Sequence, residues 1–308
     1  GDSFNDDPLR MMRAARFASQ LGFDVATEVI ESMKDLSHRI SIISAERVRD
    51  EFVKLLMSEN PRTGITILVD TGLADSVLPE IPKLRLEVDE HHHHKDVYEH
   101  SITVLEQAIE LEDRLGGPNL VLRLASLLHD IGKPKTRAFI EGGGVSFHHH
   151  EVVGARLAKK RLQALRFDND TIDAVELLTS LHLRFHGYGE GEWTDSAVRR
   201  YVRDAGEFIT HLHVLTRADC TTRNKSKAAR LAATYDSLEA RIAVLMEQEE
   251  LSKIRPDLDG AQVMQILNVK PSREVGQAMD FLLELRLEQG PIGEEAATKA
   301  LLDWWAKK

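Results

Sequence analysis

The strongest constraint on the fold is a helical periodicity that runs through almost the whole chain. Apolar residues recur every three or four positions, and the stretches begin and end at residues typical of helix termini. Pro8 suits the first turn of one stretch and Gly22 ends it, while Ser44 caps another that has Glu46 in its positive first turn. The pattern predicts helices over residues 8–21, 27–37, 45–57, 61–72, 96–115, 118–130, 149–165, 170–183, 195–205, 207–219 and 225–250, with two or three short ones after residue 259.

Strand signals are sparse. Only the glycine-rich stretch 138–147 is compatible with a small hairpin, so the chain is predicted to be all-α. Soft boundaries near residues 90 and 256 divide it into three segments: N-terminal helices over 1–90, a central helical bundle over 91–256 and a short helical tail over 257–308. Four consecutive histidines at residues 91–94 fall at the first boundary and are interpreted as a solvated linker.

Composition narrows the functional classes. With 42% hydrophobic and 29% charged residues the chain has enough apolar sequence for a packed core. Its single cysteine, Cys220, excludes an internal disulfide, and a reducing, cytoplasmic location is expected. No apolar run is long enough to span a bilayer and no signal-peptide pattern opens the chain, so no membrane partner is expected.

The formal charge of −10 argues against non-specific nucleic-acid binding over the whole surface, but it leaves room for local basic strips. Such strips could follow an RNA backbone through phosphate contacts, or they could be ordinary solvated helix faces. The three candidates are residues 159–161, the arginines 199, 200 and 203, and the segment 217–230.

A charged face marks the first long predicted helix. Asp7 and Arg10 are three residues apart and therefore share one side of the helix, and Arg13 and Arg16 continue that side. One interpretation is a capping carboxylate beside a solvated arginine face. The other follows from base chemistry, because cytosine and adenine both place an amine donor beside a ring-nitrogen acceptor. A carboxylate and a guanidinium match that pattern, whereas uracil and guanine present the opposite one.

Two blocks carry a resemblance to a known family. Residues 4–23, FNDDPLRMMRAARFASQLGF, and residues 43–56, ISAERVRDEFVKLL, resemble the neck motifs of bacterial tRNA nucleotidyltransferases (CCA-adding enzymes) and the related poly(A) polymerases. The family's Glu-Asp-x-x-Arg appears with Asp6 in place of Glu. The resemblance implies that Asp7 and Arg10 select incoming CTP or ATP and that Arg13 assists at the phosphates.

The family's polymerase head is missing from this sequence. Its Gly-Gly-x-x-Arg turn and its Asp-x-Asp pair, which holds Mg ions, are not found, and the head is expected upstream of Gly1. By itself the chain is therefore expected to be unable to polymerise nucleotides.

A second constellation combines histidines with aspartates. His100 lies on one predicted helix, His129 and Asp130 end the next, and Asp219 comes later. Nitrogen and carboxylate donors without cysteine favour Mg, Mn, Fe, Ni or Zn in an open site over a closed structural zinc, and Mg, Mn or Ni is the expected occupant. Taken singly, each histidine could equally be a packed or surface residue.

The order of these residues resembles that of the HD-domain metal phosphohydrolases. The resemblance implies that His100, His129, Asp130 and Asp219 hold a divalent metal. It further implies catalytic roles for His129, Asp130 and Lys133, with Lys133 steadying phosphate oxygens. His150 and His182 match positions that supply a second metal in some members. HD domains within some tRNA nucleotidyltransferases hydrolyse 2′,3′-cyclic phosphates and 2′-nucleotides, whereas others have no known activity.

The resemblance implies an enzyme that adds CCA to tRNA 3′ ends, with tRNA, CTP and ATP as partners and a possible homodimer. Three alternatives stay open: a poly(A) polymerase, a stand-alone HD phosphohydrolase acting on nucleotides, and a non-catalytic helical RNA-binding module.

Overall fold

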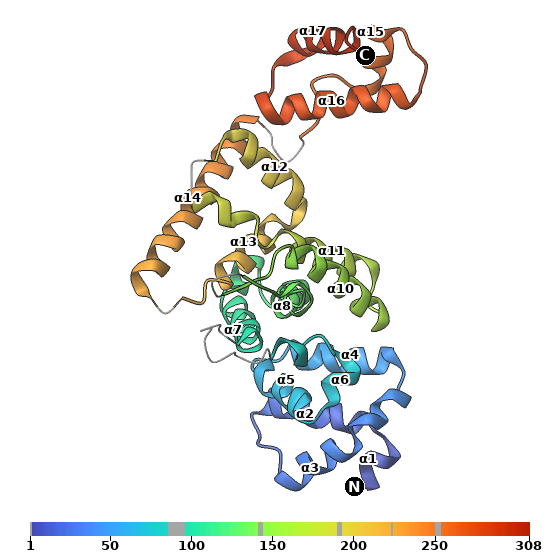
Figure 1. Ribbon diagram of the computed structural model, residues 1–308, viewed down its shortest axis with the longest axis vertical. Coiled ribbons are helices and arrows are strands. Elements are labelled where there is room, and N and C mark those ends of the chain that lie inside the picture. Colours follow the sequence, from blue (N-terminus) through green and yellow to red (C-terminus); the bar gives the residue numbers. More distant parts are fainter. Residues whose placement is uncertain (1, 86–95, 141–143, 190–192, 223, 250–253) are drawn as a thin grey trace. The chain divides into compact units, whose positions relative to one another are not determined.

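The computed structural model describes residues 2–85, 96–140, 144–189, 193–222, 224–249 and 254–308. The histidines at 91–94 and the boundary near residue 90 lie outside these ranges. The described residues form helices joined by short loops, and the prediction of an all-α fold is confirmed (Figure 1). Across them, no helix combines the length and apolar character needed to cross a membrane.

The helices follow one another along the chain with few long connections. The first nine are α1 (Asp2–Asp6), α2 (Leu9–Leu21), α3 (Thr27–Leu36), α4 (Ala45–Leu56), α5 (Pro61–Asp70), α6 (Leu73–Val77), α7 (Val97–Glu110), α8 (Leu120–Leu128) and α9 (Lys133–Thr136). The others are α10 (His150–Ala164), α11 (Asn169–Leu181), α12 (Asp195–Ala205), α13 (Ile209–Ala218), α14 (Lys225–Glu249), α15 (Gly260–Leu267), α16 (Arg273–Gln289) and α17 (Gly293–Trp305). Short 3₁₀ turns are η1 (Ser37–Ile42), η2 (Pro82–Leu84), η3 (Glu112–Leu115), η4 (Arg184–Gly189) and η5 (Gly206–Phe208).

Differences from the predicted helices occur mainly at helix ends. The stretch expected as one helix over 96–115 is divided into α7 and η3, and α8 ends at Leu128 instead of continuing to Asp130. The short helices α1 and α6 were not predicted, because five residues are too few to show a helical period.

The chain divides into two compact units. The first extends to Leu183 and also includes Thr210–Ala228. Within it, α2 packs against α4 and α5 (Figure 1). Gly64 permits the close approach of α5 to α2, because a Cβ atom there would lie 2.5 Å from the hydroxyl of Ser19. Met11 and Met12 on α2 and Phe52 on α4 are fully buried.

The same unit contains a second helical cluster formed by α7, α8, α10 and α11. Arg123 on α8 is 3% exposed and donates two hydrogen bonds to Glu112, both 2.8 Å long. The same guanidinium donates to the carbonyls of Leu56 and Ser58 at the end of α4. One buried ion pair thus joins the cluster to the N-terminal helices.

The second unit consists of Arg184–Ile209 and Ala229–Lys308. In it α12 packs on α16, and α16 packs on α15 and α17. Asp259 and Gln262 form a capping box at the start of α15. Trp304 stacks on Phe281 with the ring centroids 5.1 Å apart. The buried residues of this C-terminal core are Leu258, Val263, Ala278, Leu282, Ala297 and Leu301.

The only sheet in the described part of the chain is a two-stranded hairpin in the first unit. Strand β1 (Ala138–Phe139) pairs antiparallel with β2 (Val145–Ser146), with Ala138 opposite Ser146 and Phe139 opposite Val145. It lies within the stretch predicted to be hairpin-forming and connects α9 to α10.

Candidate metal centre and nucleotide-selecting helix

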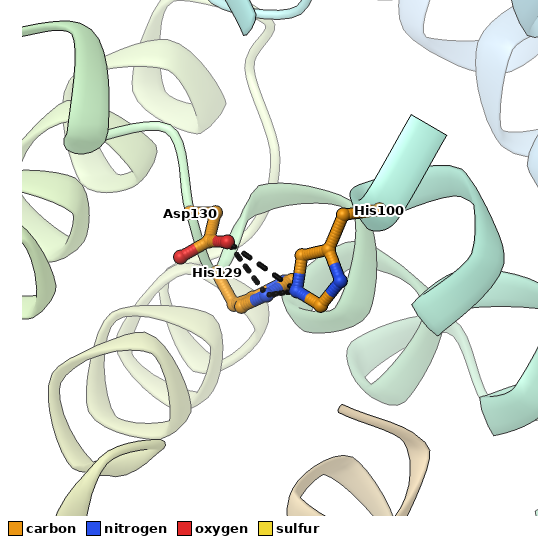
Figure 2. Close-up of side chains that lie close together, drawn as sticks. All are labelled: His100, His129 and Asp130. Atoms are coloured by element: carbon orange, nitrogen blue, oxygen red, sulfur yellow. Dashed lines mark hydrogen bonds and ion pairs between the residues drawn. The ribbon is translucent and has the colours of Figure 1, made fainter. Parts of the chain in front are cut away.

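Three helices bring histidine and aspartate side chains of the first unit to one place. His100 comes from α7, His129 and Asp130 follow the last residue of α8, and Asp219 follows α13. The Nε2 atom of His100 lies 2.9 Å from Asp219 Oδ1, 3.5 Å from Asp130 Oδ2 and 3.4 Å from His129 Nε2. Figure 2 shows the rings of His100 and His129 turned toward the Asp130 carboxylate.

Asp130 is the centre of the arrangement. It is 1% exposed, and its two oxygens face different histidines. Oδ2 lies 3.3 Å from His129 Nε2, whereas Oδ1 lies 3.1 Å from His150 Nε2 and 3.9 Å from His182 Nε2. Two groups suited to metal binding therefore share this carboxylate: His100 and His129 with Asp130, and His150 and His182 with Asp130.

The local fold sets the orientation of three of the rings in the same way. His129, His150 and His182 each place Nδ1 against a backbone carbonyl three residues earlier, at 2.8, 2.8 and 2.6 Å. If Nδ1 carries the proton and donates it, Nε2 keeps a lone pair that faces Asp130. His100 places its Nδ1 3.2 Å from the hydroxyl of Thr221, which also leaves Nε2 toward the cluster.

This donor set fits a divalent cation. Lone pairs on nitrogen and carboxylate oxygens face one another in a buried space, which is unfavourable without a positive charge between them. The Nε2 atoms of His150 and His182 are buried and lack a hydrogen-bond partner among the described residues. A metal ion in each of the two groups would bind these nitrogen and carboxylate oxygen atoms.

The charges of the cluster perturb its protonation. Burial alone would lower the pKa of His129, but the carboxylates of Asp130 and Asp219 raise that pKa to about 9. Burial, together with the neighbouring His129, lowers the pKa of His182 to about 3. Burial opposes ionisation of Asp130, yet His129 and His150 hold the pKa of this carboxyl well below its usual range.

Glycine at position 132 lets the end of α8 approach α10. A Cβ atom there would lie 2.1 Å from the carbonyl oxygen of His150 and 2.7 Å from the amide nitrogen of Gly154. No ordinary side chain fits this space. Gly132 therefore positions the start of α10, and with it the imidazole of His150.

Lys133 follows directly and faces the same carboxylate. Its Nζ lies 2.6 Å from Asp130 Oδ2. A cavity of about 670 Å³ opens beside His100 and Thr221, lined also by Asp96, Glu99 and Thr103. A space of this size accommodates a nucleotide-sized molecule next to the cluster.

The charged helix α2 presents a second candidate site in the same unit. The carboxylate of Asp7 accepts a hydrogen bond from the amide of Leu9 at 3.3 Å and lies 3.7 Å from the guanidinium of Arg47. Arg10 is exposed and donates to the hydroxyl of Ser3 at 2.6 Å. Among the described residues, Asp7 and Arg10 thus make their polar contacts with different partners and not with each other.

Arg13 points to a different partner. Its Nε lies 3.4 Å from Glu51, and Arg16 donates to the same carboxylate at 2.7 Å. Glu51 is 4% exposed, so the second predicted neck block contributes a buried acid that holds the arginine face of α2. Sequence reasoning named neither Glu51 nor Arg47, because no local spacing connects them to α2.

Members of two of the three predicted basic strips, 159–161 and the arginines 199, 200 and 203, are paired with acids within the fold. Arg161 pairs with Glu80 through two bonds, and Lys159 pairs with Glu176. Arg199 is 5% exposed and pairs with Glu249. These side chains are structural and are poorly placed to follow an RNA backbone.

Comparison with known proteins agrees with this geometry. Residues 22–84 match a family described as the probable RNA and SrmB-binding site of polymerase A, and residues 97–246 match the HD domain. The chain thus combines an HD domain with preceding helices that match this polymerase family.

Two relatives of known name identify the enzyme family to which the chain belongs. The chain is 31% identical over its whole length to an A-adding tRNA nucleotidyltransferase of Deinococcus radiodurans and covers 70% of that protein. It is also 31% identical to a CC-adding tRNA nucleotidyltransferase of Thermus thermophilus, covering 99% of this chain and 68% of the relative. The chain belongs to the tRNA nucleotidyltransferases, a family of enzymes.

Solved structures share the fold. The CCA-adding enzyme of Bacillus stearothermophilus, crystallised with CTP, superposes with a TM-score of 0.64 at 18% identity. The match covers 99% of this chain and 63% of that enzyme. The Thermotoga maritima enzyme, solved with tRNA, gives a TM-score of 0.51 at 12% identity over 98% of this chain and 62% of the other.

Proposed function

We propose that this chain is the neck, body, HD domain and tail of an enzyme that adds nucleotides to the 3′ ends of tRNA. The three predicted segments, 1–90, 91–256 and 257–308, would correspond to the neck and body, the HD domain and the tail. The main support is the relationship over the whole chain to two tRNA nucleotidyltransferases. The chain spans about two thirds of these relatives' length, so the activity is proposed for the full-length protein.

In this proposal CTP and ATP are the substrates, and Asp7 and Arg10 select their bases. The carboxylate of Asp7 would accept from the exocyclic amine and Arg10 would donate to the ring nitrogen. Both groups are held by weak, solvent-accessible contacts, with Arg47 and Ser3 respectively, which a bound base could replace at low cost. Arg13 would act near the phosphates.

The test is nucleotide incorporation by full-length protein on tRNAs that lack A, CA or CCA, with each NTP supplied singly. Arg10→Ala is expected to weaken discrimination against UTP and GTP, since a correctly placed donor–acceptor pair accounts for about 1–3 kcal/mol. Lys34→Gln, which removes an exposed lysine paired with Glu31, is the matched control. Unchanged base selection in both Arg10→Ala and Asp7→Ala would refute the assignment.

A second candidate follows from the names of the relatives. Two relatives that match nearly the whole chain are named A-adding and CC-adding tRNA nucleotidyltransferases, whereas the multifunctional CCA protein of Neisseria gonorrhoeae matches 61% of it. An enzyme of single specificity would use ATP alone or CTP alone in the same assay. Elongation of tRNA into a long poly(A) tail would indicate a poly(A) polymerase.

We further propose that the HD domain hydrolyses 2′,3′-cyclic phosphates or 2′-nucleotides with a divalent metal, such as Mg, Mn or Ni. The observation that carries this proposal is the set of three Nδ1-anchored histidines whose Nε2 atoms face Asp130. His100, His129, Asp130 and Asp219 would hold one ion, and His150 and His182 would share Asp130 with a second.

A bound ion would supply Lewis-acid activation of water for attack on phosphorus. The chain's own residues fix the geometry of that reaction. The backbone carbonyls keep the imidazoles in one tautomer, and Asp130 stays ionised because its pKa is low. Lys133 would exchange its contact with Asp130 for a phosphate oxygen, while water adds to phosphorus and one ring P–O bond breaks.

Metal content and turnover of 2′,3′-cyclic AMP test this second proposal. His129→Ala and Asp130→Ala are expected to lose bound metal and to reduce turnover at least a hundredfold. His150→Ala and His148→Ala form a matched pair of neighbours, the first buried and the second exposed. Only the first should reduce metal content. Turnover that survives in both His129→Ala and Asp130→Ala would show that the reaction uses another site.

A further inference from the structure

The hairpin between α9 and α10 combines features that the proposed hydrolysis does not yet use. Three cations precede its first strand at alternate positions, Lys133, Lys135 and Arg137, with no acidic residue between them. Phe139 and Ile140 follow and are 66% and 52% exposed, so two large apolar side chains adjoin the cations at the surface. In a chain with a charge of −10 this segment is both basic and apolar on its surface.

The side chains of Arg137 and Phe139 form a cation–π contact. The guanidinium carbon of Arg137 lies 4.9 Å from the centre of the Phe139 ring and covers one face of it. Among the described residues, no carboxylate forms an ion pair with Arg137 or Lys135. The cationic groups are therefore available for an external anion, and the ring is available for stacking.

Both strands connect directly to the metal cluster. The first follows α9, whose Lys133 contacts Asp130 at 2.6 Å. The second is followed by Phe147, whose carbonyl oxygen lies 2.8 Å from the Nδ1 of His150 and whose ring lies 5.7 Å from Lys133 Nζ. Phe139 pairs with Val145, two residues from Phe147, which is about 7 Å along an extended strand. The exposed ring of Phe139 thus lies on a hairpin whose two ends both lead to the cluster.

The hairpin segment and the cavity beside His100 carry opposite charges, since Lys135 and Arg137 precede the first strand of the hairpin and acidic residues line the cavity. Asp96 and Glu99 line that cavity, so a polyanion such as an RNA backbone is repelled there more strongly than a single nucleotide. Exposed aromatic rings together with arginine are typical of surfaces that bind single-stranded nucleic acid, because bases stack on the ring and phosphates meet the cation.

We propose that the hairpin binds the 3′-terminal nucleotides of a single-stranded RNA whose terminal phosphate enters the HD site. A base would stack on Phe139, and the adjoining phosphates would contact Arg137 and Lys135. This inference rests on the proposed hydrolytic function and specifies its substrate as the end of an RNA chain in preference to a free mononucleotide.

The test measures binding and turnover separately in the full 308-residue chain. The binding probe is a fluorescein-labelled single-stranded RNA octamer that ends in a 3′-phosphate, measured by fluorescence anisotropy. Phe139→Ala is expected to raise its Kd about tenfold, the effect of one base–aromatic stack, while Phe139→Tyr keeps the Kd within about twofold. Lys135→Gln and Arg137→Gln should each reduce the slope of log Kd against log salt by about 0.7.

Phe23→Ala is the matched control, because Phe23 is 65% exposed but does not belong to the hairpin. The inference is overturned if Phe139→Ala binds the octamer as tightly as the unmodified chain. That result would mean that the exposed ring has another purpose, such as packing against protein. Equal weakening by Phe23→Ala would also overturn it.

Turnover of 2′,3′-cyclic AMP separates this inference from the function on which it rests. A mononucleotide lacks the second base, so Phe139→Ala should leave its turnover unchanged and should slow only hydrolysis of RNA ending in a 2′,3′-cyclic phosphate. If no variant hydrolyses either substrate but octamer binding still depends on Phe139, the hydrolytic proposal fails and the RNA-end site stands. If Phe139→Ala hydrolyses both substrates as fast as the unmodified chain does, the hydrolytic proposal stands and the RNA-end site fails.

Discussion

Replacing Arg123 by methionine should destabilise the first unit more than any surface change. The guanidinium is buried and makes two hydrogen bonds to Glu112 and two to the carbonyls of Leu56 and Ser58. Methionine fills much of the same volume but supplies no donor. Glu112, 4% exposed, would keep only the hydrogen bond from the amide of Asn119 among those found here.

The magnitude follows from the unpaired carboxylate. Removing one partner of a buried ion pair costs about 3–5 kcal/mol, since the remaining charge stays desolvated. A domain is stable by about 5–15 kcal/mol, so the loss is a large fraction of the total. At a urea dependence of about 2 kcal/mol per molar, the midpoint of unfolding should fall by about 2 M.

Urea unfolding followed by circular dichroism measures this loss. Arg62→Met is the matched control: Arg62 makes a similar two-bond pair with Glu106 at 2.7 Å, but both side chains are about one third exposed, and the loss should stay below about 1 kcal/mol. The double variant Arg123→Met with Glu112→Leu should recover most of the stability, because no buried charge is left. A loss below about 1 kcal/mol for Arg123→Met alone would refute this reasoning.

Two further predictions concern the metal cluster. Gly132→Ala must displace the carbonyl of His150, so it should lower both metal affinity and thermal stability. Gly260→Ala is the control, because the space around Gly260 is open and neither quantity should change. Equal metal affinity in the two variants would contradict the packing argument. In metal-free protein, the folded-state pKa of His129 is about 9 against an ordinary 6.5, so its stabilising contribution is complete below pH 6.5 and is lost as the pH rises through 9. This difference in pKa corresponds to about 3 kcal/mol, and the melting temperature in EDTA should fall between pH 6.5 and 9. Saturating Mn²⁺ takes the place of the proton and should remove this fall, while a flat melting temperature in EDTA would contradict the expected coupling with Asp130.

The helices that carry the site could be predicted because their signals are local. Gly22, predicted to end the first long helix, acts within a few residues and is the C-cap of α2 in the structure. The ends of longer elements were less predictable. Thus α8 stops at Leu128, and His129 and Asp130 continue as a turn that brings both side chains into the cluster.

The identity of the candidate ligands also came from sequence, through a pattern of residue types and order. Their orientation did not. The hydroxyl of Thr221 beside His100 and the carbonyl behind each of the other rings depend on the packing of α7, α8, α10 and α11. The pairing of Asp7 with Arg47 likewise joins residues 40 positions apart, which no helical spacing relates.

Sequence alone determined the helical class, the placement of most helices and the residue types available for chemistry, because periodicity and capping are properties of neighbouring residues. Tertiary structure decided which of those residues meet. It placed both oxygens of Asp130 against different histidines, placed Arg123 and Arg199 in buried ion pairs, and left Phe139 exposed beside Arg137. Distances between side chains on separate helices depend on how the whole core packs, and local sequence carries no direct record of that packing.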